Sequence, residues 1–540
     1  MTPRSRGAAR PVASWLAVLL IAAGPIRAQT NSPIPATFFG LNPVHTGDFP
    51  PLPFGTLGHP PFVWPWVEAQ RDSFDFSLFD RFVIDAMGRG LYDETTNTVH
   101  MAITLGLTPD WAVANHATCT HGAPGGHTQC ASPPDDLTDW TDLLTHLIDH
   151  YDGSDIDHPH IQYYELWNEA DDSLWWTPPP GDTNHAALIG LARLAYPIVH
   201  LDPVSQLLSP SVAGKIDEQA TWMAGYLKAG GAAYADVGVF HGYMGANGAA
   251  SFPMPEEEGK FGSTPTRITR MRAVFDTCGL AGKPMMMTEG SWGNMNVTDP
   301  DTQVAWLARY LLLHAGYRST TDLQFVSWFC WADSAFGWGD LETGTHAPNA
   351  AAIAYSTVYQ WVVGARIAAP FAGGTDGTWV GTLTRPGGYV GKVVWNSQGP
   401  ATYTPPGPEY ISYRDLTGES FPITPGSSVP IGAKPVIVEK GTITNAVPPA
   451  GPGAPRLRIE PSPTRAAARI DFGVAFEGPG RVQVVDAQGR VVRTLRVSAG
   501  ATSVQWDGRA ADGRLAATGA YFVRVASPGY AAVGHLSVAR

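Results

Sequence analysis

Two glutamates lie at the ends of strand-like stretches of this sequence and could act together. The stretch 163–169 (YYELWNE) ends at Glu169, and the stretch 283–290 (KPMMMTEG) carries Glu289 near its end. Two carboxyl groups are the minimum equipment for cleaving a glycosidic bond, because one protonates the leaving oxygen and the other attacks or stabilises the anomeric carbon. We therefore predict a glycoside hydrolase with Glu169 and Glu289 as its catalytic residues. This chemistry needs no metal ion and no organic cofactor.

Other carboxylates near the predicted pair have simpler interpretations. Alternation along a strand places Glu165 on the same face as Glu169, but four residues deeper, where we expect a buried partner or a salt bridge. Asp171, Asp172 and the acidic run 256–258 are expected to face solvent.

The composition limits the classes of partner. A net charge of -13 argues against nucleic acid, because phosphate binding needs a basic surface. A neutral polysaccharide or oligosaccharide would tolerate that charge. The 18 tryptophans can fill hydrophobic cores and can also pack against sugar rings, so they support a sugar-binding cleft only weakly.

The first 28 residues have the pattern of a secretory signal peptide. Arg4, Arg6 and Arg10 precede an apolar run at 15–23, which is too short for a spanning helix, and a small-residue cleavage site lies near Ala28. We expect the mature chain to begin near Gln29 and to be secreted or held at the cell surface.

Four cysteines are present, and two of them lie close together. Cys119 and Cys130 enclose a loop, and in an oxidising compartment we expect a local disulfide between them. His121 and His127 lie between the two cysteines, so a metal site is the alternative, although structural zinc sites usually have tighter paired spacing. The other two, Cys278 and Cys330, are expected to be buried thiols, with a bridge between them left open.

Buried strands alternate with amphipathic helices over some 330 residues, which predicts parallel βα units. The expected strands are residues 37–42, 54–57, 99–105, 163–169, 206–210, 236–241, 284–289 and 324–331. The expected helices are residues 75–88, 139–150, 184–201, 221–229, 268–278, 302–315 and 350–362. Eight such strands close a (β/α)8 TIM barrel, an α/β fold, over residues 29–365. The chemistry of such barrels lies at the carboxyl ends of the strands, where Glu169 and Glu289 are expected.

Beyond the barrel the helical pattern stops. Short strand-like pieces separated by Gly and Pro turns predict a small antiparallel β-sandwich over residues 366–445. Residues 446–455 are rich in Pro, Gly and Ala and are expected to form a linker. Residues 456–540 show further alternating strands and are expected to form an independent immunoglobulin-like β domain.

The first 440 residues resemble clan A glycoside hydrolases, closest to the family 39-like group. Five pieces of sequence carry the resemblance: Thr108-Pro109-Asp110-Trp111, Trp167-Asn168-Glu169-Ala170 followed by Trp175-Trp176, Phe240-His241-Gly242-Tyr243, Thr288-Glu289-Gly290, and Trp331. The clan commonly has an arginine on strand two near the nucleophile. The stretch 54–59 contains none and offers His59 in that area.

The resemblance implies roles for individual residues. It makes Glu169 the acid/base and Glu289 the nucleophile of a retaining mechanism. Asn168 would hydrogen-bond the sugar 2-hydroxyl, and His241 or Tyr243 would orient or contact the nucleophile. The expected sugar-contacting tryptophans are Trp331, Trp111 and Trp175. His241 and Trp331 could instead be core residues, and Trp175 with Trp176 could simply cover a hydrophobic loop.

The last domain resembles the immunoglobulin-like modules of flagellar hook-capping proteins and of secretion-sorting domains. The stretches 505–508 (QWDG) and 518–523 (TGAYFV) carry this resemblance. It implies contact with the cell surface or with secretion machinery.

Two other functions remain open from the sequence. The chain could be a catalytically silent carbohydrate-binding barrel displayed through its last domain, or a purely structural surface protein. The identity of the glycan, its linkage, and endo or exo action are not encoded in these motifs.

Overall fold

The computed structural model describes most of the chain from Ser32 to Ala539. The residues outside the description are 1–31, 43–49, 59–62, 123–125, 246–252, 293–298, 333–338, 345–346, 442–456, 462–463, 466, 474, 477–478, 487–490, 512, 528–529 and 540. The expected signal peptide, His59 and the expected linker therefore lie outside the described residues.

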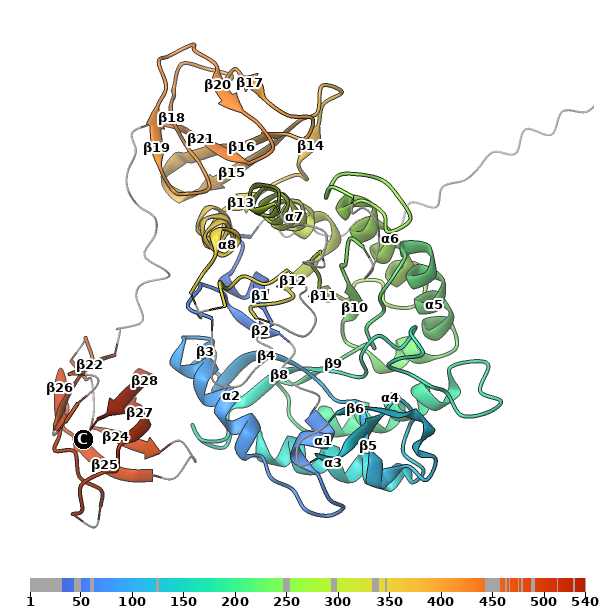
Figure 1. Cartoon of the computed structure of the whole chain (residues 1–540), viewed down its shortest axis with the longest axis vertical. Coiled ribbons are helices and arrows are strands. Elements are labelled where there is room, and N and C mark those ends of the chain that lie inside the picture. Colours follow the sequence, from blue (N-terminus) through green and yellow to red (C-terminus); the bar gives the residue numbers. More distant parts are fainter. Residues whose placement is uncertain are drawn as a thin grey trace, which may run out of the picture.

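Eight parallel strands form a closed barrel, which confirms the predicted α/β architecture (Figure 1). In chain order they are β1 (Phe39–Leu41), β2 (Thr56–Gly58), β4 (Thr98–Thr104), β8 (His160–Glu165), β9 (Gln206–Leu208), β10 (Gly238–His241), β11 (Met285–Glu289) and β12 (Leu323–Trp328). Strand β12 pairs with β1. The ring closes between β9 and β10 through a parallel bridge from Leu208 to Val237. A short strand, β3 (Tyr92–Asp93), pairs with β4 outside the ring.

Helices surround the barrel. They are α1 (Val63–Val67), α2 (Ser77–Gly88), α3 (Leu137–His150), α4 (Ala186–Val199), α5 (Ile216–Lys228), α6 (Thr264–Thr277), α7 (Pro300–Thr321) and α8 (Ala350–Val362). Four of them begin at a side-chain cap that accepts a backbone N–H of the first turn: Asp136 for α3, Ser263 for α6, Asp299 for α7 and Asn349 for α8. Among the described residues, no helix combines the length and the apolar character needed to cross a bilayer.

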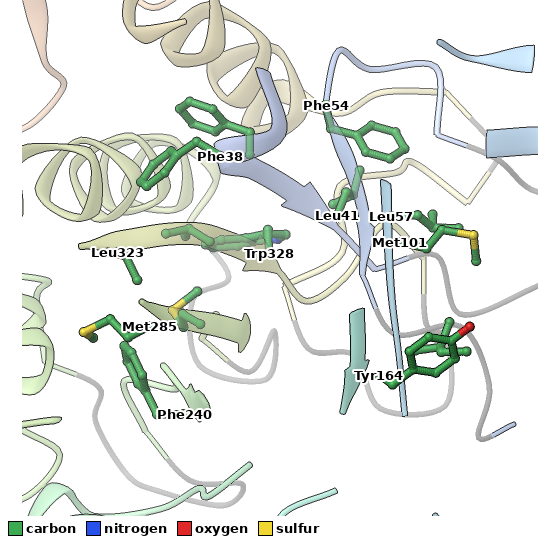
Figure 2. Close-up of a cluster of buried hydrophobic side chains, with 14 of the residues drawn as sticks. Phe38, Leu41, Phe54, Leu57, Met101, Tyr164, Phe240, Met285, Leu323 and Trp328 are labelled. Atoms are coloured by element: carbon green, nitrogen blue, oxygen red, sulfur yellow. The ribbon is translucent and has the colours of Figure 1, made fainter. Parts of the chain in front are cut away.

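The strands separate an inner from an outer hydrophobic layer. The inner layer is a compact cluster that includes Ala102, Val239, Met286 and Phe325. The outer layer joins the strands to the helices, and Figure 2 shows part of it. At Gly40 a Cβ atom would lie 2.1 Å from the Phe325 ring, so this position of β1 must stay free of a side chain for the inner layer to fill the barrel.

A small β-sandwich follows the barrel and packs on α7 and α8 (Figure 1). Its strands are β13 (Arg366–Ile367), β14 (Ala372–Gly373), β15 (Thr378–Arg385), β16 (Tyr389–Asn396), β17 (Ala401–Tyr403), β18 (Tyr410–Arg414), β19 (Ser420–Pro422), β20 (Val429–Ile431) and β21 (Val436–Lys440). The indole N–H of Trp395 in β16 donates to Glu256 Oε1 at 2.8 Å. The Glu256 side chain is 5% exposed and lies 3.3 Å from Arg309 of α7. The expectation that Glu256 faces solvent was therefore wrong, because the sandwich covers it.

The C-terminal region forms two antiparallel sheets with a core of their own. One sheet contains β22 (Arg458–Glu460), β23 (Ala468–Asp471) and β26 (Ser503–Trp506). The other contains β24 (Gly480–Asp486), β25 (Val491–Val497), β27 (Gly519–Ser527) and β28 (Tyr530–Val538). Residues from both sheets, among them Ile470, Val484, Trp506 and Val523, form a hydrophobic cluster separate from that of the barrel. A separate core is the mark of an independent domain.

The cysteines define a thiol count that can be measured. Cys119 and Cys130 form a disulfide, whereas Cys278 and Cys330 are buried thiols that are not part of a disulfide in the described structure. We predict two titratable thiols per chain in denaturant without reductant and four after reduction, measured with a chromogenic disulfide reagent. In the folded protein both thiols should react slowly, because a buried thiol is shielded from the reagent. Zero thiols in denaturant would contradict this assignment and show a second bridge.

Candidate active site

Glu289 points into the barrel because β10 and β11 change register at their carboxyl ends. Phe240 pairs with Met287, but the next residue of β10, His241, pairs with Glu289, so Thr288 is an extra residue on β11. Strict alternation would have placed Glu289 on the outer face with Met287. The bulge turns it to the inner face beside His241, which is a common use of bulges next to active sites.

Glu169 follows β8 in a tight, strained loop. Its φ angle is 36°, in the left-handed region that residues other than glycine rarely adopt. Ser211, which follows β9, holds this conformation: its Oγ accepts the Glu169 N–H at 2.9 Å, and its carbonyl accepts the Ala170 N–H at 3.1 Å. In turn the Ser211 N–H donates to the Trp167 carbonyl at 3.0 Å. The end of β9 therefore fixes the direction of the Glu169 side chain.

His241 and Tyr243 each contact one of the two glutamates. His241 Nδ1 lies 2.7 Å from Glu169 Oε1 and 3.6 Å from Glu289 Oε2. The Tyr243 hydroxyl donates to Glu289 Oε2 at 2.5 Å. All four side chains are buried, and one oxygen of each glutamate lies within 4.8 Å of the other and of a His241 nitrogen. The structure thus brings the two predicted carboxyl groups together at the carboxyl ends of the barrel strands.

Burial and the charges at this site together shift the pKa values of His241 and Glu289. Burial lowers the pKa of His241, but the charges of Glu289 and Glu169 outweigh burial and raise that pKa to about 9. For Glu289, burial is the largest effect and raises its pKa to about 7, against the opposing influence of His241 and the Tyr243 hydroxyl. Between these two values His241 is a cation and Glu289 an anion. A cationic imidazole held against both glutamates offsets their mutual repulsion.

Two further carboxyl groups lie close to the pair. Glu165 ends β8, is 1% exposed, and has its pKa raised by burial, while the nearby His241 acts in the opposite direction. Asp171 is partly buried and accepts the Ala213 N–H at 2.9 Å. Burial raises the pKa of Asp171 to about 7. Glu165 is thus buried as expected, but no salt bridge to it is found among the described residues, and Asp171 is more enclosed than a solvent-facing residue.

The predicted sugar-contacting residues have different surroundings. Asn168 is buried, and its Oδ1 has no hydrogen-bond partner among the described residues, so it can accept a hydrogen bond from a ligand hydroxyl. Trp331 is 1% exposed, and its indole is therefore covered by protein rather than open as a platform.

The other two predicted tryptophans, Trp111 and Trp175, lie next to a small sheet beside the barrel. It consists of β5 (Thr108–Pro109), β6 (Cys119–Gly122) and β7 (Thr128–Cys130). The Trp111 ring lies 4.9 Å from the Arg71 guanidinium, and its N–H donates to the Glu68 carbonyl. The ring of His121 stacks on Trp175 with centroids 4.4 Å apart. Both tryptophans are partly exposed.

Two groups of side chains could hold a metal ion by spacing alone. Glu169, His241 and Glu289 are one group, but the His241 nitrogen already hydrogen-bonds Glu169, and Tyr243 already donates to Glu289. The second group lies near the end of α1 and on α3 and comprises the buried Glu68, the exposed Asp72 and the partly exposed Asp142. The alternative site in the disulfide loop is not assembled, because His121 Nε2 contacts the Leu174 carbonyl and His127 contacts Asp110.

Some residues that shape the site gave no signal in the sequence. Ser211 was within an expected strand-to-helix connection, and only the structure shows that it supports Glu169. Arg267, a buried arginine of α6, donates to the carbonyls of His241 and Tyr243. An arginine on the buried face of a helix is unusual, and this is the one sequence feature that could have drawn attention to it.

Comparisons at the sequence level match one part of the chain. Residues 467–529 match the FlgD Ig-like domain family. The two-sheet region at the C-terminus is thus an immunoglobulin-like domain of this type. No curated protein matches the chain.

Comparisons at the level of structure identify the fold of the first two domains. A family 39 glycoside hydrolase from the gut symbiont Bacteroides cellulosilyticus WH2 matches with a TM-score of 0.56 at 17% identity, covering 75% of this chain and 81% of that chain. A monomeric β-xylosidase from Caulobacter crescentus CB15 matches with a TM-score of 0.54 at 14% identity, covering 76% and 98%. A GH39 β-xylosidase from Caulobacter crescentus matches with the same TM-score and coverage at 16% identity. The chain therefore has the fold of clan A glycoside hydrolases, in agreement with the resemblance of its motifs.

The raised pKa values predict how the stability of the barrel depends on pH. The folded protein holds protons on Glu289 and His241 more tightly than the unfolded chain, whose groups titrate at 4.5 and 6.5. The stability from these groups is complete below the unfolded values and is lost as the pH rises through about 7 and about 9. Each proton contributes a slope of up to about 1.4 kcal/mol per pH unit.

We predict that Glu289→Gln flattens this slope between pH 5 and pH 9. The change removes one titrating group and also the charge that does most to raise the pKa of His241. The measurement is urea unfolding followed by tryptophan fluorescence at several pH values. Glu218→Gln, the same change at an exposed position of α5, should keep the wild-type slope. Equal slopes in all three proteins would contradict the pKa assignment.

Proposed function

We propose that the protein is a retaining glycoside hydrolase that cleaves β-glycosidic bonds of a polysaccharide or oligosaccharide. The observation that carries the proposal is the buried carboxyl pair, Glu169 and Glu289, whose oxygens lie within 4.8 Å at the carboxyl end of a (β/α)8 barrel. Retaining enzymes need their two carboxyl groups about 5 to 5.5 Å apart, whereas inverting enzymes need about 6.5 to 9.5 Å to admit a water molecule. The short separation supports direct attack by a carboxylate.

In the first step Glu289 acts as the nucleophile and Glu169 as the acid. The Glu289 carboxylate forms a bond to the anomeric carbon, the bond from that carbon to the leaving oxygen breaks, and Glu169 gives its proton to the leaving oxygen. The Tyr243 hydroxyl and His241 stabilise the charge of Glu289 before attack. As Glu289 loses its charge in the ester, Glu169 gains one, and His241 is already hydrogen-bonded to it.

In the second step water releases the sugar. The Glu169 carboxylate takes a proton from the water molecule, whose oxygen attacks the anomeric carbon while the bond to Glu289 breaks. This restores the starting protonation of both glutamates. Asn168 is placed beside Glu169 with a free amide oxygen, which suits a sugar hydroxyl donor.

The rest of the chain supports a role outside the cytoplasm. The N-terminal charge and hydropathy pattern is that of a secretory signal, and we propose that the protein is secreted or held at the cell surface. The FlgD Ig-like domain would then contact surface or secretion machinery rather than take part in catalysis. The two structural matches from Caulobacter crescentus are β-xylosidases, which makes β-xylosides the first substrates to test.

Substitution of each glutamate tests the proposal. We predict that Glu289→Ala abolishes release of the aglycone from a panel of aryl β-glycosides, because no covalent intermediate can form. Glu169→Ala should lower kcat/KM by about 10²–10⁴-fold, the usual contribution of general acid catalysis, with the smallest loss on activated leaving groups. External azide should restore turnover in Glu289→Ala and give products of inverted configuration.

Glu218→Gln serves as the control for this series, because it lies exposed on α5. If no glycoside or polysaccharide of the panel is cleaved while one of them binds, the chain is a carbohydrate-binding barrel without catalysis, and the proposal fails.

The pKa of Glu289 predicts the acid side of the pH profile. Because this carboxyl must be ionised to attack and its pKa is raised to about 7, kcat/KM should fall as the pH drops below about 7. The Tyr243 hydrogen bond lowers that pKa, so Tyr243→Phe should move the acid limb to higher pH. The measurement is kcat/KM against pH for both proteins. An acid limb near pH 4 in the wild type would show that Glu289 is not perturbed.

A further inference from the structure

Three consecutive residues at the end of β10, His241 to Tyr243, form a bridge between the two glutamates. His241 contacts Glu169, Gly242 follows, and Tyr243 contacts Glu289. Strand β10 ends at His241, so the carbonyls of this segment project beyond the regular sheet. Buried carbonyls without partners are costly, so each of these three needs a donor from elsewhere.

Helical side chains supply a donor to every one of these carbonyls. The His241 carbonyl accepts from Gln219 Nε2 at 3.1 Å and from an Arg267 guanidinium nitrogen at 3.3 Å. The Tyr243 carbonyl accepts from the other Arg267 nitrogen at 2.9 Å. The Gly242 carbonyl accepts from the Tyr310 hydroxyl at 2.9 Å.

The donors come from three successive helices and are connected to one another. Gln219 belongs to α5, Arg267 to α6 and Tyr310 to α7, and all three are buried. Arg267 also donates to Gln219 Oε1 at 2.8 Å, which orients the amide toward the His241 carbonyl.

Burying the charge of Arg267 costs desolvation free energy, and a helix that only covers a barrel does not need such a residue. Its guanidinium is fully enclosed, makes no ion pair within the described part of the chain, and has its pKa lowered to about 10 by burial. A buried charge without a counter-ion is normally selected against. Besides its contacts to Gly214, Phe261 and Gln219, its hydrogen bonds go to His241 and Tyr243, the residues that contact the two glutamates.

We propose that Arg267, together with Gln219 and Tyr310, is a positioning clamp that sets the backbone of residues 241–243 so that His241 reaches Glu169 and Tyr243 reaches Glu289. The clamp touches no substrate and acts through His241 and Tyr243. Its effect on turnover rests on the proposed function, whereas its effect on the geometry of His241 does not.

The magnitude expected of such a clamp is large. The two contacts that the clamp positions are short: His241 lies 2.7 Å from Glu169, and Tyr243 lies 2.5 Å from Glu289. A small rotation of the peptide at 241–243 would break both. A misplacement of about 1 Å at a reacting group can reduce the rate about 10²-fold.

The chain offers a matched control for each substitution. Arg272, also buried on α6, donates to the carbonyls of Lys283 and Leu280 in the loop before β11, at the opposite end of the barrel. Tyr355, buried on α8, donates to the Gly40 carbonyl of β1 at 3.0 Å, as Tyr310 does to the Gly242 carbonyl. Each control loses the same type of bond at a place remote from the pair.

The kinetic test compares four variants. Arg267→Met should lower kcat about 10²-fold with KM changed less than threefold, and Tyr310→Phe should lower kcat about tenfold. Arg272→Met and Tyr355→Phe should keep kcat within about twofold of the wild type. Arg267→Lys should recover part of the loss, since an ammonium group can still donate to carbonyls. Equal kcat losses in the clamp and control variants would show general destabilisation and overturn the proposal.

A second test needs no substrate. The groups that face His241 are Glu165, Glu169 and Glu289, with Tyr243 two residues along. In histidine-labelled protein, the NMR signal of His241 is assigned as the one that is lost in His241→Gln. The pKa measured from this signal should be near 9 in the wild type and lower in Tyr310→Phe and Arg267→Met. Its titration should be unchanged in Tyr355→Phe. An unchanged titration in both clamp variants would overturn the clamp, whereas absence of hydrolysis by the wild type would overturn the proposed function alone.

Discussion

The contact between His241 and the two glutamates is the interaction on which the site depends. Burying two carboxyl groups with oxygens within 4.8 Å of each other is unfavourable, because like charges repel strongly in a buried site. The buried His241 imidazole stays protonated to about pH 9, and its positive charge offsets this repulsion. Its Nδ1 also contacts one oxygen of each glutamate. The barrel, the bulge in β11 and the donors on the helices all serve to place this one ring and its two partners.

The local departures from regular structure gather around the same point. The bulge turns Glu289 inward, Glu169 has a left-handed backbone held by Ser211, and Asn168 keeps an unpaired buried oxygen. Each of these features lowers stability in a free protein. Three such features beside one another at the glutamate pair are the pattern expected of a site where binding and chemistry outweigh stability.

The architecture and the glutamate pair were open to prediction from the sequence, whereas the way each glutamate is aimed was not. Strand and helix periodicity gave the barrel, and the helix at Ala350–Val362 was placed correctly at both ends. Alternation counted from Met287 would put Glu289 on the outer face, whereas the extra residue Thr288 places it on the inner face, and no local pattern of sequence marks a bulge.

Contacts between distant segments were also hidden. Glu256 lies in an acidic run that is typical of a solvent-facing loop, and only the docking of the β-sandwich buries it. Arg267 contacts Tyr243 and His241, which lie 24 and 26 positions away in the chain, and local sequence patterns do not reveal contacts at that separation.

The β-sandwich packs against the barrel through apolar side chains. Phe371, Leu383, Val393 and Trp395 of the sandwich belong to the same hydrophobic cluster as the barrel. Removing the sandwich would expose that apolar surface and would also expose the buried ion pair of Arg309 and Glu256. The barrel and the sandwich therefore share one hydrophobic cluster despite their different architectures, and we expect a fragment that keeps the glutamate pair folded to extend through β21 rather than to end at α8.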